Sequence, residues 1–146
     1  MKILFIQNRI LFPTNTGGRI RTLNVLRYLA KWHDVTYLCN LEAGEESHCD
    51  AMREVGLKLE TVPWKSPALG DLKFYISLAL NFFSREPFNV AKDNNPLLRA
   101  RAEALVSQEK FDLVICDFIF MVPIAKNLPC RGSLLFQHNV EAQIFE

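Results

Sequence analysis

The sequence predicts a doubly wound α/β fold, in which helices cover both faces of a parallel sheet. Short apolar runs rich in branched residues alternate with segments of helical period, and turn residues separate them. The chain has 146 residues, of which 49% are hydrophobic, so one core can bury roughly two-thirds of the unfolded surface. Strands that alternate with helices pair in parallel through right-handed crossovers, and 3-2-1-4-5 is the most economical strand order, as in Rossmann-like folds.

Five segments have the character of strands: Lys2–Ile6, Val35–Cys39, Leu57–Val62, Asp112–Cys116 and Ser133–Gln137. The third segment alternates apolar and polar residues, which is typical of a strand at the edge of a sheet. Cys39 and Cys116 end apolar runs, so we expect buried thiols there. The sequence has no C-x-x-C pair, so no metal site is predicted, and free thiols fit a reducing cytosol.

Six segments have the character of helices: Arg19–Trp32, Glu45–Val55, Gly70–Phe83, Asn95–Gln108, Met121–Asn127 and one that starts at Asn139. We expect Gly56 to stop the second helix, and Asn95 with Pro96 to begin the fourth. The third helix is apolar on both sides from Leu72 to Phe83. We favour core packing for it, and the alternative left open is peripheral contact with a lipid surface or a partner.

The composition narrows the classes of partner. Seventeen basic and 16 acidic residues give a net charge of +1, which does not attract nucleic acid non-specifically. The N-terminal apolar run is too short for a signal peptide, and Leu72–Phe83 is about half the length of a spanning helix. We therefore expect a cytoplasmic protein that is at most peripheral on the inner face of a membrane.

The C-terminal residues carry no signal for the end of a helix. The last predicted helix runs into Glu146 after about two turns, without a capping glycine or a basic last turn. We therefore expect residues 1–146 to be the N-terminal domain of a longer protein.

The edge where the strands end is the expected ligand site, because open parallel sheets bind ligands there. Gly17 and Gly18 follow the first strand through a long loop and lead into a helix. Backbone amides free of side chains at a helix start suit phosphate, and Arg19 and Arg21 add positive charge. The alternative is a turn that needs a positive φ, and the sequence favours neither. The loop matches neither G-x-G-x-x-G nor G-x-x-x-x-G-K-[ST], which disfavours a P-loop NTPase.

Polar residues also follow the fourth and fifth strands. Asp117 could bind a hydroxyl or act as a base, or could only start the next turn. His138 could carry a proton near neutral pH, with Glu141 to orient it. Alternatively, His138 or Asn139 caps the last helix with Glu141 as its capping partner. In the predicted strand order, the ends of strands one and five are about 10 Å apart, so we expect His138 beside the Gly17–Gly18 loop.

Three stretches carry a resemblance to a known family. The opening Met-Lys-Ile-Leu-Phe-Ile is followed by a long loop, Gly-Gly-Arg-Ile-Arg, and a helix ending Leu-Ala-Lys-Trp-His-Asp-Val-Thr. The others are the segment from Glu109 to Asp117 and Gln-His-Asn-Val-Glu-Ala from Gln137. Together they resemble the N-terminal domain of retaining GT-B glycosyltransferases of family 4, and look closest to bacterial enzymes of exopolysaccharide or exosortase-associated systems.

The resemblance implies roles for the candidate residues. Gly17, Gly18 and Arg21 would meet the diphosphate of a nucleotide-sugar donor. His138 would lie by the donor sugar and the attacking hydroxyl. The acceptor side, for a glycan or lipid-linked acceptor, would be lined by Asp117, Asn139 and Glu141. In such enzymes a second domain with an E-x7-E pair holds most of the donor. No such pair occurs here in a plausible setting, so this chain alone is expected to be inactive, and it needs no cofactor beyond the donor substrate.

Two other classes remain as alternatives. A non-catalytic binding or regulatory module of flavodoxin-like or receiver-like type would have the same element pattern. A receiver needs an aspartate at the end of its third strand, where Thr61-Val62-Pro63 stands. An epimerase or reductase is disfavoured by the missing glycine fingerprint and by Asn40, which stands where an acidic residue is expected.

Overall fold

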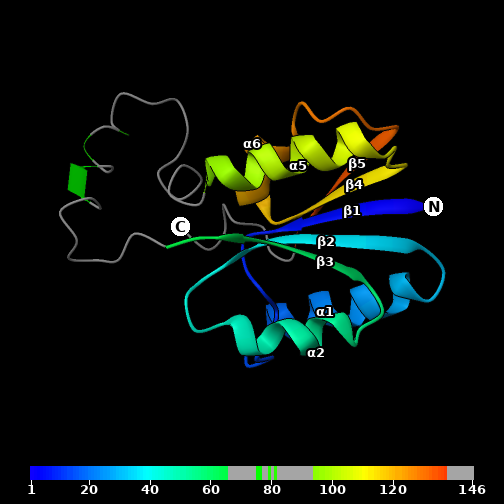
Figure 1. Ribbon diagram of the computed structural model, residues 1–146, viewed down its shortest axis with the longest axis horizontal. Coiled ribbons are helices and arrows are strands. Elements are labelled where there is room, and N and C mark those ends of the chain that lie inside the picture. The colour runs from blue at the N-terminus through cyan, green and yellow to red at the C-terminus, as the bar shows by residue number, and fades with distance from the viewer. Residues whose placement is uncertain (66–74, 77–78, 80, 82–93, 138–146) are drawn as a thin grey trace.

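The computed structural model describes residues 1–65, 75–76, 79, 81 and 94–137. Its centre is a five-stranded, all-parallel sheet of order β3-β2-β1-β4-β5 (Figure 1). The strands are β1 Lys2–Gln7, β2 Asp34–Leu41, β3 Lys58–Pro63, β4 Leu113–Asp117 and β5 Gly132–Phe136. The predicted α/β class and Rossmann-like strand order are confirmed. This order differs from the flavodoxin order 2-1-3-4-5, and the alternative of a non-catalytic binding or regulatory module stays a prediction.

Helices cover both faces of the sheet. Helices α1 (Gly17–Ala30) and α2 (Cys49–Arg53) lie on one face, and α5 (Pro96–Gln108) and α6 (Val122–Ala125) lie on the other (Figure 1). The short 3-10 turns η1 (Glu46–His48) and η2 (Ile119–Met121) precede α2 and α6. The structure is therefore a three-layer arrangement with β1 in its middle.

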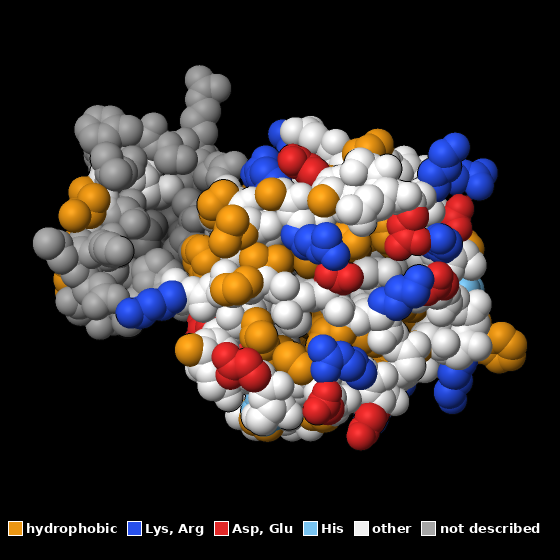
Figure 2. Space-filling view, viewed as in Figure 1, with side chains coloured by type: hydrophobic (Ala, Val, Ile, Leu, Met, Phe, Trp, Pro, Cys, Tyr) orange, Lys and Arg blue, Asp and Glu red, His pale blue; other side chains and the backbone are white. Residues whose placement is uncertain are grey.

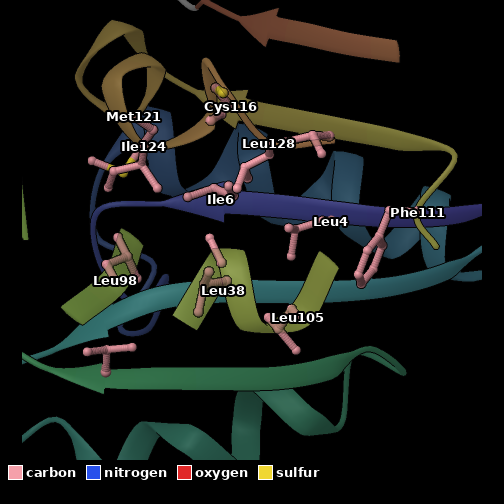
Figure 3. Close-up of a cluster of buried hydrophobic side chains, with 14 residues drawn as sticks. Leu4, Ile6, Leu38, Leu98, Leu105, Phe111, Cys116, Met121, Ile124 and Leu128 are labelled. Atoms are coloured by element: carbon pink, nitrogen blue, oxygen red, sulfur yellow. The ribbon is translucent and has the colours of Figure 1, made fainter. Parts of the chain in front are cut away.

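The core consists of two apolar clusters, one on each face of the sheet. Because side chains alternate along a strand, Ile3 and Phe5 of β1 face α1 and α2, whereas Leu4 and Ile6 face α5 and α6. The second of these clusters is drawn in Figure 3, where Leu98 and Leu105 of α5 meet Leu38 of β2. These four side chains of β1 are all buried, so helices enclose the first strand on both faces of the sheet.

The parallel register brings the strand ends to one edge. Cys39 is the register partner of Gln7, Val62 is that of Asn40, and Phe136 is that of Asp117. Gln7, Asn40 and Asp117, which lie at the ends of separate strands, are therefore placed along a single edge of the sheet.

Several predicted boundaries differ from the observed ones, most clearly in the first two helices. The first helix begins at Gly17 rather than Arg19, because Thr16 is its N-cap and its hydroxyl accepts from the Arg19 N–H at 3.5 Å. The predicted helix Glu45–Val55 is divided into η1 and the short α2, which ends before Gly56 at φ 88°. The helix therefore ends earlier than expected, with Glu54 as its C-cap, and Gly56 turns the chain two residues later. The buried thiols Cys39 and Cys116 are confirmed.

Most of the predicted helix Gly70–Phe83 lies outside the described residues. Of its apolar residues, Tyr75 and Ile76 are 56% and 49% exposed, and Ala79 is exposed as well. The expectation that these three pack in the core is wrong.

Candidate functional site

A cleft of about 420 Å³ lies at the carboxyl ends of the two central strands β1 and β4. The loop between β1 and α1 forms one side, and the turn after β4 forms the other. The residues that line it are Gln7, Asn8, Arg9, Leu11, Asn15, Thr16, Gly18, Arg19, Phe118 and Phe120. Its volume is within the range of small-molecule sites, and its position is where doubly wound sheets bind ligands.

Gly17 and Gly18 form the first turn of α1, beside this cleft. In the described ranges the glycines with positive φ are Gly44 and Gly56, so the interpretation of Gly17 and Gly18 as a turn that needs positive φ is wrong. A Cβ at Gly17 would meet nothing within 4 Å, and one at Gly18 would meet only the Phe118 ring at 3.8 Å. In the described part of the chain, neither glycine N–H has a hydrogen-bond acceptor. The fold therefore does not require glycine here, and the amides are available to a ligand.

Hydrogen bonds hold the loop that leads to these glycines. The Arg19 guanidinium donates to the Pro13 carbonyl at 3.0 Å and to Asn15 Oδ1 at 3.4 Å. The Tyr37 hydroxyl donates to the Arg9 carbonyl at 2.8 Å. Tyr37 is fully buried, and this burial raises the pKa of its phenol well above the usual value. The phenol therefore stays protonated and keeps its bond to the loop.

Asp117 lies beneath the cleft rather than in its wall. Its side chain has no exposed surface, and it accepts hydrogen bonds from Gln7 Nε2 and from the Thr22 hydroxyl, the latter at 2.8 Å. Gln7 Oε1 in turn accepts from the Asn8 N–H at 2.6 Å. In this arrangement Asp117 positions Gln7 and Asn8, which do line the cleft. A direct contact of Asp117 with an acceptor stays a prediction.

Phe118 has an unusual backbone conformation. Its φ and ψ are 65° and 156°, a region that is populated almost only by glycine. The Phe118 N–H donates to the Phe136 carbonyl at 3.1 Å, and its ring lies next to Gly18 and stacks with Phe120 at 6.4 Å between centroids. The strained turn thus places an aromatic wall opposite the glycines.

The structure separates Arg21 from the cleft. Its guanidinium lies over the Phe136 ring, 5.3 Å from the centroid, whereas Arg19 lines the cleft. A role of Arg21 as a phosphate ligand stays a prediction. The remaining predicted residues His138, Asn139 and Glu141 lie outside the described residues, and their placement beside Gly17 and Gly18 stays a prediction.

Sequence reasoning did not select the aromatic wall or the partners of Asp117. Phe118 and Phe120 look like ordinary apolar residues in the sequence, and nothing local marks a positive φ. Gln7 carried a signal, because an amide that directly follows a buried apolar strand needs a partner. Among the residues that the structure describes, no cluster of three or more His, Cys, Asp or Glu side chains could hold a metal ion.

Comparisons with known proteins show the fold. No protein-family model matches the chain, and no curated protein matches it. The chain is similar to the C-terminal domain, residues 78–226, of a hydrogenase from Pyrococcus furiosus, with a TM-score of 0.54 and 13% identity over 94% of this chain and 90% of that one. A second structure of that domain, residues 83–215, has a TM-score of 0.50 and 15% identity over the same shares. At such identities the likeness concerns the α/β architecture alone.

The surface and the helices give two further observations. The face seen in Figure 2 carries basic and acidic side chains side by side, as expected for a net charge of +1. Within the described ranges, no helix is both long and apolar enough to pass through a membrane.

Proposed function

We propose that this chain is the N-terminal, acceptor-side domain of a retaining GT-B glycosyltransferase, which transfers a sugar from a nucleotide-sugar donor to a glycan or lipid-linked acceptor. The observation that carries the proposal is the first turn of α1, where the Gly17 and Gly18 amides lie beside a cleft and have no hydrogen-bond acceptor among the described residues. The fold tolerates a Cβ at both positions. A ligand that approaches the backbone closely therefore accounts for glycine at these positions better than a requirement of backbone conformation does.

The chemistry of the transfer suits this site. Retaining transfer passes through a state with oxocarbenium character while a diphosphate departs. Amides at a helix start stabilise the charge of a leaving diphosphate without moving, because they are already aimed at it. In this proposal His138 lies at the donor sugar, and a second Rossmann-like domain supplies the remaining donor contacts. The resemblance of the sequence to family 4 supports this division.

Binding of uridine diphosphate, followed by backbone amide NMR, tests the proposal on the chain itself. We expect the Gly17 and Gly18 amide signals to shift in a saturable way, because a phosphate oxygen accepts from both N–H groups. Gly18→Val is expected to weaken binding at least about tenfold, since its side chain obstructs the approach of the ligand, while the unfolding midpoint in urea stays near that of the unaltered chain.

A matched control is Gly132→Ala, at the opposite end of the sheet. Its Cβ would meet Leu113 Cδ1 at an ordinary 3.6 Å, so it should leave both folding and binding unchanged. If nucleotide diphosphates shift no signal near α1, or if Gly18→Val binds as well as the unaltered chain, the phosphate role of the glycines is wrong. Sugar transfer by the 146-residue chain alone would contradict the proposed need for a second domain.

A further inference from the structure

A second concave site lies on the same edge of the sheet, at the carboxyl ends of β2 and β3. Its volume is about 520 Å³, and it shares no lining residue with the cleft beside Gly18. Leu41, Pro63 and Trp64 come from the strand ends, and Pro96 and Leu97 come from the start of α5. Neighbouring strands are about 4.8 Å apart, so the two sites are separated by a distance that one extended ligand can span.

Trp64 gives the pocket an aromatic surface. Its indole is half-buried, and its backbone N–H donates to the Leu41 carbonyl at 2.9 Å, which fixes the residue beyond the end of β3. Two proline rings, Pro63 and Pro96, add rigid apolar walls. A flat aromatic surface beside rigid walls suits a ligand that has a broad apolar face.

Polar groups of both signs surround this apolar surface. Glu46 and Lys65 line the pocket together with Asn95, so a carboxylate, an ammonium and an amide are all present. Glu46 accepts from the Gly44 N–H at 2.8 Å, which holds the carboxylate in place. The carboxylate accepts hydrogen bonds and the ammonium donates them, and their charges are opposite. This combination favours an uncharged ligand with many hydroxyls over an anion or a bare hydrocarbon chain.

Buried amides support the floor of the pocket. Asn95 Nδ2 donates to Asn40 Oδ1 at 2.7 Å, and Asn95 Oδ1 accepts from the Leu97 N–H at 3.0 Å. Asn95 is only 1% exposed. The pocket wall formed by α5 is therefore fixed to β2 before any ligand arrives, which lowers the cost of binding.

We infer that this pocket is a carbohydrate subsite, in which the C–H face of a pyranose packs on Trp64 and its hydroxyls bond to Glu46 and Lys65, while the buried Asn95 holds the wall of the pocket in place. One part of the inference rests on the proposed function, namely that the sugar bound here belongs to the acceptor of the transfer. A glycan held here extends along the sheet edge toward the cleft beside Gly18, where transfer takes place.

Tryptophan fluorescence tests the inference because the chain has two tryptophans. Trp32 is 71% exposed, so Trp32→Phe leaves Trp64 as the reporter without a change in the core. We expect neutral trisaccharides, used as a panel of maltotriose, cellotriose, mannotriose and chitotriose, to change Trp64 emission in a saturable way. Trp64→Phe should keep most of the affinity by calorimetry, and Trp64→Ala should lower it about tenfold.

Matched controls separate the outcomes. Trp32→Ala removes an equally large ring elsewhere and should leave the affinity unchanged. No saturable change with any trisaccharide, or an equal change in the Trp64→Phe variant, overturns the inference. A response to dodecyl phosphate in place of sugars also overturns it, since the pocket then takes an alkyl chain. If sugars bind at Trp64 but uridine diphosphate does not bind near Gly18, the carbohydrate subsite stands and the proposed function fails.

Discussion

At the scale of single residues, the conformation of Phe118 is the most informative feature of the cleft. A non-glycine residue at φ 65° and ψ 156° costs on the order of 1–3 kcal/mol. The hydrogen bond to Phe136 and the packing of the ring against Gly18 hold it there. Such strain persists only where the surroundings enforce it, and here the enforced group is a wall of the candidate site.

Two substitutions at this position separate strain from packing. Phe118→Ala and Phe118→Gly both remove the ring, but only glycine adopts the observed backbone angles freely. We expect Phe118→Gly to be more stable than Phe118→Ala by about 1–3 kcal/mol, measured by urea unfolding. Equal stabilities would show that the turn relaxes when the ring is removed, and that the backbone is not strained by its surroundings.

Residue-scale features were also the least predictable from the sequence. A Gly-Gly pair before a helix is visible locally, which is why the sequence could mark Gly17 and Gly18 as candidates, and Gly18 lines the cleft. The sequence offered Arg19 and Arg21 together and could not tell which of them faces the loop, since that depends on the exact helix start at Gly17. The bonds from Gln7 and Thr22 to Asp117 join residues 110 and 95 positions apart, and no local pattern contains such pairs.

At the scale of elements, the two long helices differ in how their starts are held. Asn95 caps α5 with an Oδ1 that accepts from the Leu97 N–H at 3.0 Å, and it also bonds to the buried Asn40. Thr16 caps α1 through a longer contact of 3.5 Å to the Arg19 N–H, at the surface. The sequence predicted the start of α5 because Asn-Pro is a strong capping signal, whereas it placed the start of α1 two residues late.

This difference predicts unequal costs for removing the caps. We expect Asn95→Ala to destabilise the chain by about 2–3 kcal/mol, because a cap is lost and the buried Asn40 side chain loses its partner. Thr16→Ala should cost about 0.5–1 kcal/mol. Urea unfolding of both variants measures the difference, and Asn95→Ser, which keeps the cap alone, is expected to lie between them. A cost for Asn95→Ala no larger than that for Thr16→Ala would contradict the structural role of the buried amide pair.

Strands and their order were predictable for a physical reason. A strand that is buried on both faces appears in the sequence as a continuous run of apolar residues. When strands alternate with helices, the rule of right-handed crossovers leaves few possible orders for the parallel strands. The edge position of β3 followed from its alternating pattern. The helix predicted over Glu45–Val55 was too long because its polar residues carry a helical propensity that only a short apolar segment around Met52 stabilises.

At the scale of the whole molecule, groups buried in the core make stability depend on alkaline pH. Burial raises the pKa of Cys116 from 9.0 to about 11, and it raises those of Cys39 and Tyr37 as well. Above pH 9 the unfolded chain releases the Cys116 proton while the folded chain keeps it. The buried thiol therefore makes its full contribution to the free energy of unfolding below about pH 9. This contribution is lost as the pH rises toward 11.

Urea unfolding at pH 7, 9 and 10 measures this dependence. We expect a nearly constant midpoint from neutral pH to about pH 8.5, then a steady decrease. Cys116→Ala removes one of the groups, so its midpoint should decrease less steeply over the same interval, although its value at neutral pH is lower because of the lost packing. A midpoint that rises between pH 9 and 10, or an equally steep decrease in the variant, would refute the role given to this thiol.

The central place of β1 has a consequence for how the protein is made. β1 precedes both of its neighbours in the chain, yet the Lys2 N–H bonds to Asp112, 110 positions later. At ribosomal rates of about 5–20 residues per second, β1 waits on the order of ten seconds before β4 exists to pair with it. During that interval a strand composed of Ile3, Leu4, Phe5 and Ile6 has one open edge, which another chain could pair with before β4 covers it.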